Sequence, residues 1–385
     1  MADFHTINPA TEEVVAEYNI MSLDEIRDKI NRTHSAWTQW KNEPFSHKSA
    51  LMQRMAQLLK EKKKLLGRII TDEMGKPINQ SISEVEKCAW VCEYYAEHAE
   101  KFLEATPIET EASESYIHHS PLGVVLAIMP WNFPFWQVFR FAAPGLMAGN
   151  AALLKHSRNT TQCGLEIEKL FEQAGFPVNL FTTLVVDSGP IEDIIANPKV
   201  AAVTLTGSTE AGKSVASIAG KHLKKTVLEL GGSDPYVVLD DADLDLAAEM
   251  CVTGRLINTG QSCIAAKRFI ITRKHVRQFT EKVKALMETR SFGNPLDTGS
   301  DLGTMARKDL REELHQQVRK SVEMGAQCIL GGKVPEGKGY FYPATLLTNV
   351  TKGMPAFDDE LFGPVACIIT AKDEHEALQI ANDSV

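Results

Sequence analysis

Gly123-Val124-Val125-Leu126-Ala127-Ile128-Met129 is the stretch that decides the fold, because an uninterrupted apolar run of this length predicts a buried strand. A helix is expected directly after it, over 135–147, and the same alternation continues along the chain. Further strands are expected at 151–154, 181–186, 201–205 and 226–230, and further helices at 161–173, 191–196 and 211–219. Short apolar strands that alternate strictly with helices predict an α/β fold with a doubly wound parallel sheet, which binds ligands outside the carboxyl ends of its strands.

The residues before this sheet are predicted to be mainly helical. Ser22-Leu23-Asp24-Glu25 has the pattern of a capping box and predicts a helix that runs towards Trp40. Ser46 is expected to cap a second helix that continues through Lys64, and 82–102 predicts a third. Between these helices and the sheet, 114–119 predicts a short, exposed strand.

A second α/β unit is expected to begin near Gly231. Its predicted strands are 236–239, 268–271 and 365–370, and its predicted helices are 244–258, 275–289 and 310–324. The chain has 385 residues, which at roughly 150 residues per domain predicts two or three domains.

Composition and charge exclude several classes of partner. The chain is 24% charged and 44% hydrophobic, has a net charge of −9, and contains no basic cluster longer than Lys62-Lys63-Lys64, so nucleic acid is not expected to bind. The first residues lack a basic start followed by an apolar stretch, so no secretory leader is expected. The most apolar segment, 124–136, is interrupted by prolines and is shorter than the roughly 18 residues of a membrane span.

The cysteines indicate a reducing compartment and no metal site. They form no CxxC pair and no His/Cys spacing suited to zinc, so we expect reduced thiols in a cytoplasm. All except Cys263 are expected to be small buried hydrophobes. The chain contains Cys88, Cys92, Cys163, Cys251, Cys263, Cys328 and Cys367.

Cys263 and Glu229 are the candidate catalytic pair. Cys263 ends the segment Asn258-Thr259-Gly260-Gln261-Ser262-Cys263, in which small residues leave room for a substrate beside the thiol. Glu229 opens a second glycine-rich turn, Glu229-Leu230-Gly231-Gly232. A thiol nucleophile and a carboxylate that handles a proton or a water suit covalent catalysis on a carbonyl.

These two segments resemble the cysteine and glutamate motifs of the NAD(P)-dependent aldehyde dehydrogenases. The resemblance extends from Asn8-Pro9-Ala10-Thr11 to the last residue, with the motifs in the family's order. It implies a dinucleotide-binding domain formed by 1–108 and 122–230, an oligomerisation hairpin at 109–121 and a catalytic domain at 231–385. It also implies a homo-oligomer, either a dimer or a tetramer.

The resemblance gives the catalytic residues their roles. Asn132 lies in Pro130-Trp131-Asn132-Phe133-Pro134, where a buried amide needs a hydrogen-bond partner. The resemblance implies that its side chain and the Cys263 backbone N–H hold the oxyanion of the adduct between Cys263 and the aldehyde. Hydride transfer to the nicotinamide would leave a thioester, which a water activated by Glu229 would hydrolyse to the acid.

The resemblance also implies a site for NAD or NADP. In Thr206-Gly207-Ser208, a strand end leads into a helix whose N-terminus would bind the dinucleotide pyrophosphate. Arg158 stands where the family commonly has a Glu that holds the 2′-hydroxyl of the ribose, and a cation suits a 2′-phosphate. We therefore expect NADP to be used as well as NAD. The cofactor residues implied are Trp131, Lys155, Ser157, Arg158, Gly207, Ser208, Gly212, Leu230, Glu360 and Phe362.

A different functional class remains open for the same loop. Gly207 to Ser214 also satisfies GxxxxGK[ST], the phosphate-binding loop of nucleoside triphosphatases, and 236–240 resembles the apolar strand that ends in a metal-binding Asp. Against this alternative, the loop follows the fourth strand of the sheet instead of an early one. Cys263 and Glu229 would also have no role in such an enzyme.

Arg140 and Trp136 are the candidate substrate-binding residues. Arg140 falls where the resemblance to succinate semialdehyde dehydrogenases places an Arg that binds the substrate carboxylate, and the alternative is a structural salt bridge. Those enzymes often have a second Arg where this chain has Ile257, so a general aldehyde dehydrogenase stays open. Family members also continue beyond the position of residue 385, so an inactive fragment with an unpaired 114–119 strand is a further alternative.

Overall fold

The computed structural model describes residues 2–384, which divide into two compact units. The first unit comprises residues 2–6, 14–70 and 81–230, and the second comprises 7–13, 71–80 and 231–384. A two-stranded N-terminal sheet, which the sequence patterns did not indicate, pairs β1 (Phe4–Ile7) with β2 (Val14–Tyr18). Within residues 2–384, no helix has both the length and the apolar character needed to cross a membrane.

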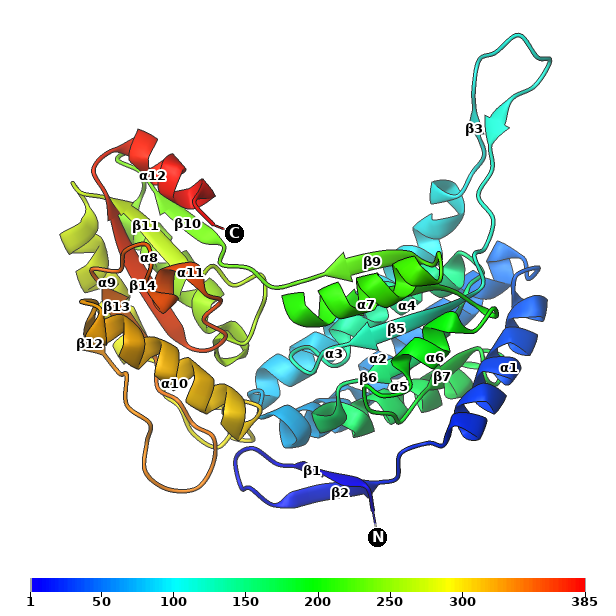
Figure 1. Ribbon diagram of the computed structural model, residues 1–385, viewed down its shortest axis with the longest axis horizontal. Helices are drawn as coiled ribbons and strands as arrows, with labels where there is room; N and C mark the ends of the chain where they lie inside the picture. Colours follow the sequence, from blue (N-terminus) through cyan, green and yellow to red (C-terminus); the bar gives the residue numbers. More distant parts are fainter. Residues whose placement is uncertain (1, 385) are drawn as a thin grey trace. The chain divides into compact units, whose positions relative to one another are not determined.

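The first unit is built on a five-stranded parallel sheet with the strand order β7-β6-β5-β8-β9 (Figure 1). The central strand is the apolar run predicted to decide the fold. The chain adds strands on one side of it and then on the other, so the predicted doubly wound parallel sheet is confirmed. The strands are β5 (Val124–Met129), β6 (Ala151–His156), β7 (Phe181–Thr183), β8 (Val200–Thr206) and β9 (Lys225–Glu229).

Helices on this unit follow the predicted alternation. The helices of the sheet region are α4 (Trp136–Met147), α5 (Thr161–Ala174), α6 (Ile191–Ala196) and α7 (Thr209–Lys221), with the short 3-10 helix η1 (Arg158–Thr160). Three helices come before the sheet, namely α1 (Leu23–Trp40), α2 (Phe45–Met74) and α3 (Ile78–Phe102). The strand β7 ends at Thr183, earlier than the predicted 181–186.

The helix ends test two predicted caps. The capping box at Ser22 is confirmed, because its side chain accepts from the Glu25 N–H while the Glu25 carboxylate accepts from the Ser22 N–H. The predicted cap at Ser46 is wrong, because α2 already begins at Phe45. The chain turns into this helix at Pro44, whose carbonyl accepts from the Lys48 N–H at 3.2 Å.

A thin hairpin extends from the first unit (Figure 1). It pairs β3 (Thr106–Pro107) with β4 (Tyr116–Ile117) in antiparallel orientation. The predicted strand at 114–119 is therefore present, although only Tyr116 and Ile117 form it. Both residues are exposed, as expected for a strand with water on each face.

The second unit contains a five-stranded sheet in the order β10-β11-β14-β13-β12. All neighbours are parallel except β12 and β13, which are antiparallel. The strands are β10 (Pro235–Val238), β11 (Arg268–Thr272), β12 (Gln327–Leu330), β13 (Thr345–Thr348) and β14 (Val365–Ala371). The helices are α8 (Leu244–Leu256), α9 (Val276–Glu288), α10 (Lys308–Glu323), α11 (Pro355–Asp358) and α12 (Glu374–Asn382).

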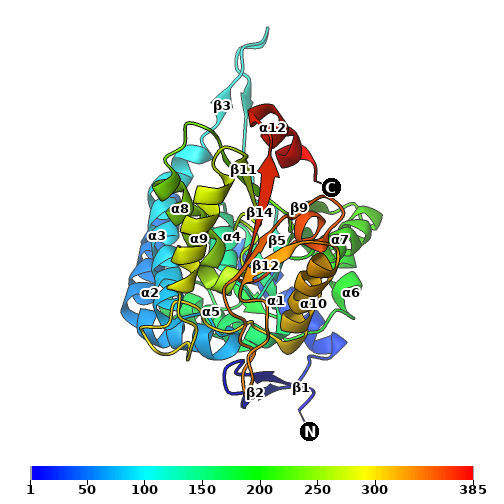
Figure 2. The same cartoon turned by 90° about the vertical axis from the view of Figure 1, so that its left-hand side faces the viewer.

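Alternation along β11 gives this sheet two apolar faces. Phe269 and Ile271 pack with α8 and α9, which lie side by side (Figure 2). Ile270, between them in the chain, points to the other face and packs with residues of α10, α11 and α12. The sheet is therefore covered by helices on both faces, as its nearly continuous apolar strands require.

Candidate active site

Predicted site residues of the first unit follow the carboxyl ends of adjacent parallel strands. Ile128 at the end of β5 is in register with Lys155 of β6 and with Leu205 of β8. Thr206, which follows Leu205, is in register with Glu229 of β9. The sheet therefore brings the segment after β5, which carries Trp131 and Asn132, to the same edge as Lys155, Ser208 and Glu229, as expected of a doubly wound fold.

The turn that carries Asn132 is fixed by two buried groups. Glu84 of α3 accepts from the backbone N–H groups of Phe135 and Trp136, both at 2.9 Å, and so caps the start of α4, where no side chain of the helix itself does. His156 Nε2 donates to the Pro134 carbonyl at 2.9 Å. Asn132 itself is only 4% exposed. The cap by Glu84 was not predicted, because nothing local in the sequence shows which helix end its carboxylate meets.

His156 is held in its neutral form. Its Nδ1 accepts from the Ser157 N–H at 2.9 Å and lies 2.8 Å from Thr160 Oγ1, so Nε2 carries the proton that goes to Pro134. Burial lowers the pKa of His156 to about 4, with Lys155 adding to the effect and the Pro134 and Ser157 hydrogen bonds opposing it. The imidazole is thus a structural link between β6 and the Asn132 turn.

The loop after β8 is shaped by glycine and by Ser208. The Gly207 N–H donates to the Glu229 carbonyl at 3.0 Å, and Ser208 caps α7 by accepting from the Ala211 N–H at 3.3 Å. Gly212 allows α7 to lie against Leu230, because a Cβ at this position would be 2.5 Å from the Leu230 side chain. The helix N-terminus therefore faces the same sheet edge as Asn132 and Glu229.

This geometry overturns the nucleoside triphosphatase interpretation. A phosphate-binding loop must stay unwound up to its Lys, whereas α7 begins at Thr209 and includes Gly212 and Lys213. Lys213 is an exposed residue that pairs with Glu210 on the same helix at 3.1 Å. The strand that precedes Asp240 belongs to the sheet of the second unit instead of lying beside β8.

Two cationic residues lie near the end of β6, Lys155 within the strand and Arg158 just after it. Burial lowers the pKa of Lys155, and the nearby charge of Arg158 lowers it further, while Asp187 opposes the shift. The Arg158 guanidinium carbon lies 4.4 Å from the centroid of the Phe4 ring, a stacked cation–π arrangement. Ser157, between them, donates from its hydroxyl to Asn159 Oδ1 at 2.7 Å. A pair of adjacent cations, one of them poorly hydrated, favours an anionic ligand.

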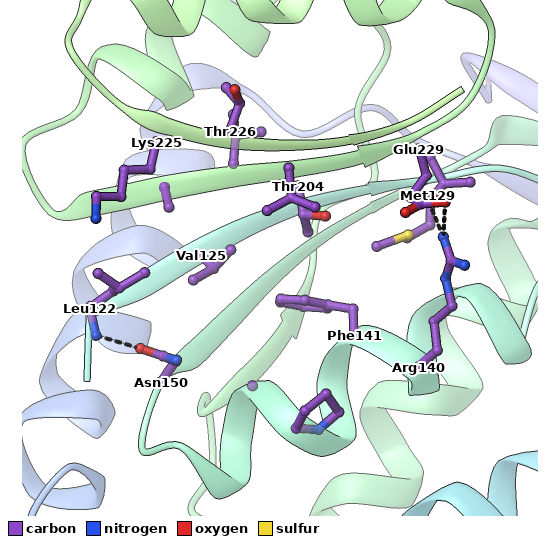
Figure 3. Close-up of a pocket in the computed structure, with 16 residues that line it drawn as sticks. Leu122, Val125, Met129, Arg140, Phe141, Asn150, Thr204, Lys225, Thr226 and Glu229 are labelled. Carbon is purple, nitrogen blue, oxygen red and sulfur yellow. Dashed lines mark hydrogen bonds and ion pairs between the residues drawn. The ribbon is translucent and has the colours of Figure 1, made fainter. Parts of the chain in front are cut away.

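Arg140 and Glu229 meet at one end of an open cavity on the first unit (Figure 3). The cavity has a volume of about 640 Å³ and is lined mainly by apolar side chains of α4 and the sheet, including Met129 and Phe141. Arg140 Nη2 lies 3.4 Å from Glu229 Oε2 and donates to Thr206 Oγ1 at 3.2 Å. The guanidinium therefore already has an anionic neighbour.

Trp136 does not line this cavity with Arg140. Instead, the Nζ of Lys87 lies 4.0 Å from the centroid of its ring. The indole is thus held by a cation from α3, near the end of α4 that Glu84 caps. Its predicted role in substrate binding stays a prediction.

In the second unit, a left-handed turn presents Cys263. Asn258, Thr259 and Gly260 have φ angles of 55°, 55° and 72°, a conformation that costs energy at the first two positions. The Gly303 N–H donates to Thr259 Oγ1 at 2.9 Å, which helps hold the turn in this form. The predicted helix 244–258 is therefore too long, since α8 ends at Leu256 and this turn follows.

Gln261 anchors the same turn to the segment 304–306. Its side chain donates to the Thr304 carbonyl at 3.1 Å and accepts from the Ala306 N–H at 2.9 Å. Cys263, two residues later, is partly exposed. Of the remaining cysteines, five are buried as predicted, but Cys328 is exposed, because β12 lies at the edge of its sheet.

Two buried cations connect the Cys263 turn with the segment 360–363. Arg255 donates to the carbonyls of Gly260, Leu361 and Gly363, the last at 2.9 Å, and burial lowers its pKa to about 10. Lys267 donates to the Cys263 carbonyl at 2.5 Å and lies 3.0 Å from Glu360 Oε1. Through Lys267, the structure connects two predicted site residues, Cys263 and Glu360. Phe362 follows Glu360 in the same segment and is partly buried.

No cluster of three or more potential His, Cys, Asp or Glu metal ligands occurs in the described part of the chain. The candidate reactive groups described above are the Cys263 thiol and the Glu229 and Glu360 carboxylates, together with the buried cations Arg255 and Lys267.

Comparisons with known proteins agree on one family. Residues 2–385 match the Aldehyde dehydrogenase family. A probable succinate-semialdehyde dehydrogenase (NADP+) from Synechocystis sp. is 44% identical over 378 residues, covering 98% of this chain and 83% of that protein. The succinate semialdehyde dehydrogenase (NAD(P)+) from Escherichia coli is 45% identical over 379 residues, covering 98% and 82%. The crystal structure of succinic semialdehyde dehydrogenase from Streptococcus pyogenes with NADP+ has a TM-score of 0.97 at 34% identity, covering 99% and 84%.

Proposed function

This chain belongs to the aldehyde dehydrogenase family, and from this premise we propose that it oxidises succinate semialdehyde to succinate with NADP or NAD. The observation that carries the choice of substrate is Arg140, a partly exposed guanidinium at the end of an apolar cavity. A guanidinium binds a carboxylate through two parallel hydrogen bonds, which a neutral aldehyde cannot provide. Relatives at 44–45% identity are named for this same substrate.

We propose Cys263 as the nucleophile. Its thiolate adds to the carbonyl carbon of the aldehyde and forms a tetrahedral adduct. The Asn132 side-chain N–H and the Cys263 backbone N–H donate to the resulting oxyanion, a type of contact that contributes about 3–4 kcal/mol in other enzymes. Bound NAD or NADP would supply the hydride acceptor, and loss of the hydride from the adduct would break its C–H bond and leave a thioester on Cys263.

Glu229 is proposed as the base of the second half of the reaction. Its carboxylate takes a proton from a water molecule, whose oxygen attacks the thioester carbon. The carbon–sulfur bond then breaks, the thiolate of Cys263 is restored and the acid leaves. Aldehyde, water and oxidised cofactor thus yield acid, reduced cofactor and a proton.

The residues at the edge of the first sheet fit a dinucleotide. Gly212 brings the N-terminus of α7 close to Leu230, and this helix start suits a pyrophosphate that Ser208 can also bind. Lys155 and Arg158 supply cations for the ribose and its 2′-phosphate. The further cofactor residues proposed are Trp131, Ser157, Gly207 and, in the second unit, Glu360 and Phe362.

We further propose that the enzyme is a homo-oligomer, a dimer or a tetramer, in the cytoplasm. The exposed hairpin β3–β4 supports this proposal, because Ile108, Tyr116 and Ile117 expose apolar side chains on or next to a sheet of only two strands, whose outer edges can pair with another chain. Measurement of the mass in solution, before and after deletion of 109–115, tests the role of the hairpin.

A general aldehyde dehydrogenase is the second candidate. It is favoured by the ion pair between Arg140 and Glu229, which gives Arg140 a structural partner without a substrate. In that case the guanidinium would orient the base and would not select a carboxylated aldehyde.

Initial rates distinguish the two candidates. We would measure reduced cofactor formed from succinate semialdehyde, butanal and propanal, each with NAD and with NADP. A kcat/KM at least about 100-fold higher for the carboxylated aldehyde supports the proposal, since such a ratio corresponds to one good charged contact. Equal values for the three aldehydes would identify a general enzyme. No reduced cofactor with any of them would overturn both candidates.

A further inference from the structure

Lys267 is a buried cation that contacts the backbone of the proposed nucleophile. Its side chain is 0% exposed, and its Nζ contacts the Cys263 carbonyl oxygen at 2.5 Å and Glu360 Oε1 at 3.0 Å. Burial lowers the pKa of Lys267, whereas the Glu360 carboxylate raises it. Because a buried ammonium needs acceptors for its N–H groups, these two oxygen atoms together hold it in position.

The backbone around Lys267 gives it little freedom. Its N–H donates to the Asp234 carbonyl at 2.9 Å, and the next residue, Arg268, begins β11. The side chain therefore spans from a fixed strand end to the turn that carries Cys263. A movement of the ammonium towards or away from Glu360 must change its hydrogen bond to that turn.

Glu360 is the solvent-accessible member of this pair. Its side chain is 27% exposed, whereas that of Lys267 is fully buried. Its second oxygen, Oε2, occupies the space beside Gly231, where a Cβ would be only 2.1 Å away. A ligand can therefore reach the Glu360 carboxylate, whereas the Lys267 ammonium is enclosed.

We propose that Lys267 is a positioning residue that couples occupancy of Glu360 to the presentation of the Cys263 thiol. This inference rests on the proposed function, in which Glu360 accepts from the hydroxyls of a ribose. When ribose hydroxyls donate to the Glu360 carboxylate, the ion pair between Glu360 and Lys267 becomes weaker. The ammonium then binds more strongly to the Cys263 carbonyl. A cation less neutralised by Glu360 also attracts the anionic thiolate, so the nucleophile is prepared when the ribose is bound.

Arg255 is a different kind of link between the same two segments. Its hydrogen bonds within the described part of the chain go to backbone carbonyls of both segments and of Ala266. These contacts hold the segments together irrespective of a ligand. Lys267, in contrast, joins the nucleophile turn to a carboxylate that a ligand can reach.

The test uses ADP-ribose, which contains the ribose that Glu360 would bind but lacks the nicotinamide ring that would cover the thiol. The readout is the rate at which iodoacetamide alkylates Cys263, measured by mass spectrometry of the intact protein. All variants carry Cys328→Ser, because Cys328 is the other cysteine that is not buried. With saturating ADP-ribose, we expect alkylation to be about fivefold faster or more when Lys267 is retained.

Lys267→Met should abolish this acceleration, leaving rates with and without ADP-ribose within twofold of each other, and Lys267→Arg should restore part of it. Arg311→Met is the matched control, because Arg311 is also nearly buried in the second unit and pairs with Glu312 and the Gly339 carbonyl. It should lower Tm without changing the response to ADP-ribose. If Lys267→Met does not fold, Gly231→Ala displaces the Glu360 carboxylate while keeping both charges, and should weaken the response.

The outcomes separate this inference from the proposed function. If the protein oxidises aldehydes and binds ADP-ribose, but Lys267→Met or Gly231→Ala responds as the protein with Lys267 and Gly231 does, the coupling is wrong and the function stands. The coupling is also wrong if Arg311→Met loses the response to the same extent. Absence of ADP-ribose binding, in a protein that oxidises no aldehyde, would overturn both.

Discussion

The Arg140 guanidinium lies 3.4 Å from the Glu229 carboxylate, so the candidate substrate anchor and the candidate base form an ion pair (Figure 3). Their side chains are 33% and 57% exposed, and pairs at this exposure contribute at most about 1 kcal/mol. A substrate carboxylate that makes two hydrogen bonds can therefore displace Glu229 from Arg140. Displacement would leave Glu229 available for its reaction with water.

Replacing Arg140 with Gln should remove the preference for a carboxylated aldehyde. A hydrogen bond to a charged group contributes about 1.5–3 kcal/mol, so kcat/KM for succinate semialdehyde should fall by roughly 10- to 100-fold. The value for propanal should change by less than about threefold. Arg27→Gln, at an exposed pair with Asp24 on α1, is the control and should change neither value. An equal loss for both aldehydes would show that Arg140 acts only through Glu229.

Replacing Glu229 with Gln should separate the two halves of the reaction. Loss of the base should lower the steady-state rate by roughly 100-fold or more, while a burst of reduced cofactor equal to the enzyme concentration remains. Stopped-flow absorbance measures both quantities. A variant with the full steady-state rate would exclude Glu229 as the base.

The same variant also tests the ion pair. Without the Glu229 carboxylate, Arg140 is free to bind the product, so the inhibition constant for succinate should fall by up to about fivefold. Two other ligands serve as comparisons. Butyrate has a carbon chain of the same length with a single carboxylate, and the neutral diamide of succinate has no carboxylate. If succinate binds no more tightly, the pair does not compete with the substrate.

Arg158 should determine how well NADP is used. Its stacking on Phe4 holds the guanidinium beside Lys155, where it can meet a 2′-phosphate. Arg158→Glu should lower kcat/KM for NADP by roughly 10- to 100-fold, because a favourable charge contact becomes a repulsive one. The value for NAD should fall less or rise, since a carboxylate can accept from a 2′-hydroxyl. Parallel loss with both cofactors would place Arg158 outside the phosphate site.

Much of the fold was predictable, because parallel strands buried on both faces appear as continuous apolar runs between helices. The first sheet and its order of elements follow from that pattern. The resemblance to the aldehyde dehydrogenases singled out Asn132, Ser208 and Glu229, and the pattern places these residues at or just after strand ends. In contrast, β12 is short, half-exposed and interrupted by a bulge, so its pairing with β13 depends on contacts distant in the sequence.

The parts of the site that were not predicted depend on tertiary contacts. The apolar pattern of α8 continues to Asn258, yet the chain leaves the helix because Gln80, Thr304 and Ala306 hold the following turn. No local sequence pattern indicates the structural roles of Glu84 and Lys267, because the groups that they contact are backbone atoms or lie far away in the sequence. Local patterns identify which residues end the strands, but not which buried charges hold them.

Stability should depend on pH through His156. Its pKa of about 4 lies below the value of 6.5 in an unfolded chain, so the unfolded state binds the proton more readily between these values. Above pH 6.5 the neutral imidazole imposes no penalty on the folded state. As the pH falls towards 4, the free energy of unfolding decreases, by about 3 kcal/mol in total. Urea unfolding at pH 7 and pH 5 should show a smaller difference for His156→Gln than for the unchanged protein. The exposed His118 offers the control, since His118→Gln should leave the difference unchanged.

The left-handed turn before Cys263 should tolerate no side chain at Gly260. Its φ is 72°, and a Cβ would lie 2.1 Å from the backbone oxygen of Gly363, which cannot move away as a side chain could. Gly260→Ala should therefore destabilise the protein by about 2–4 kcal/mol and slow alkylation of Cys263. Gly220, within α7, has open space where a Cβ would lie, because nothing beyond its chain neighbours and its own helix backbone comes within 4 Å. Gly220→Ala should therefore raise stability by about 0.5–1 kcal/mol. Equal Tm values for the two variants would mean that the close approach of Gly260 to Gly363 does not constrain the turn before Cys263.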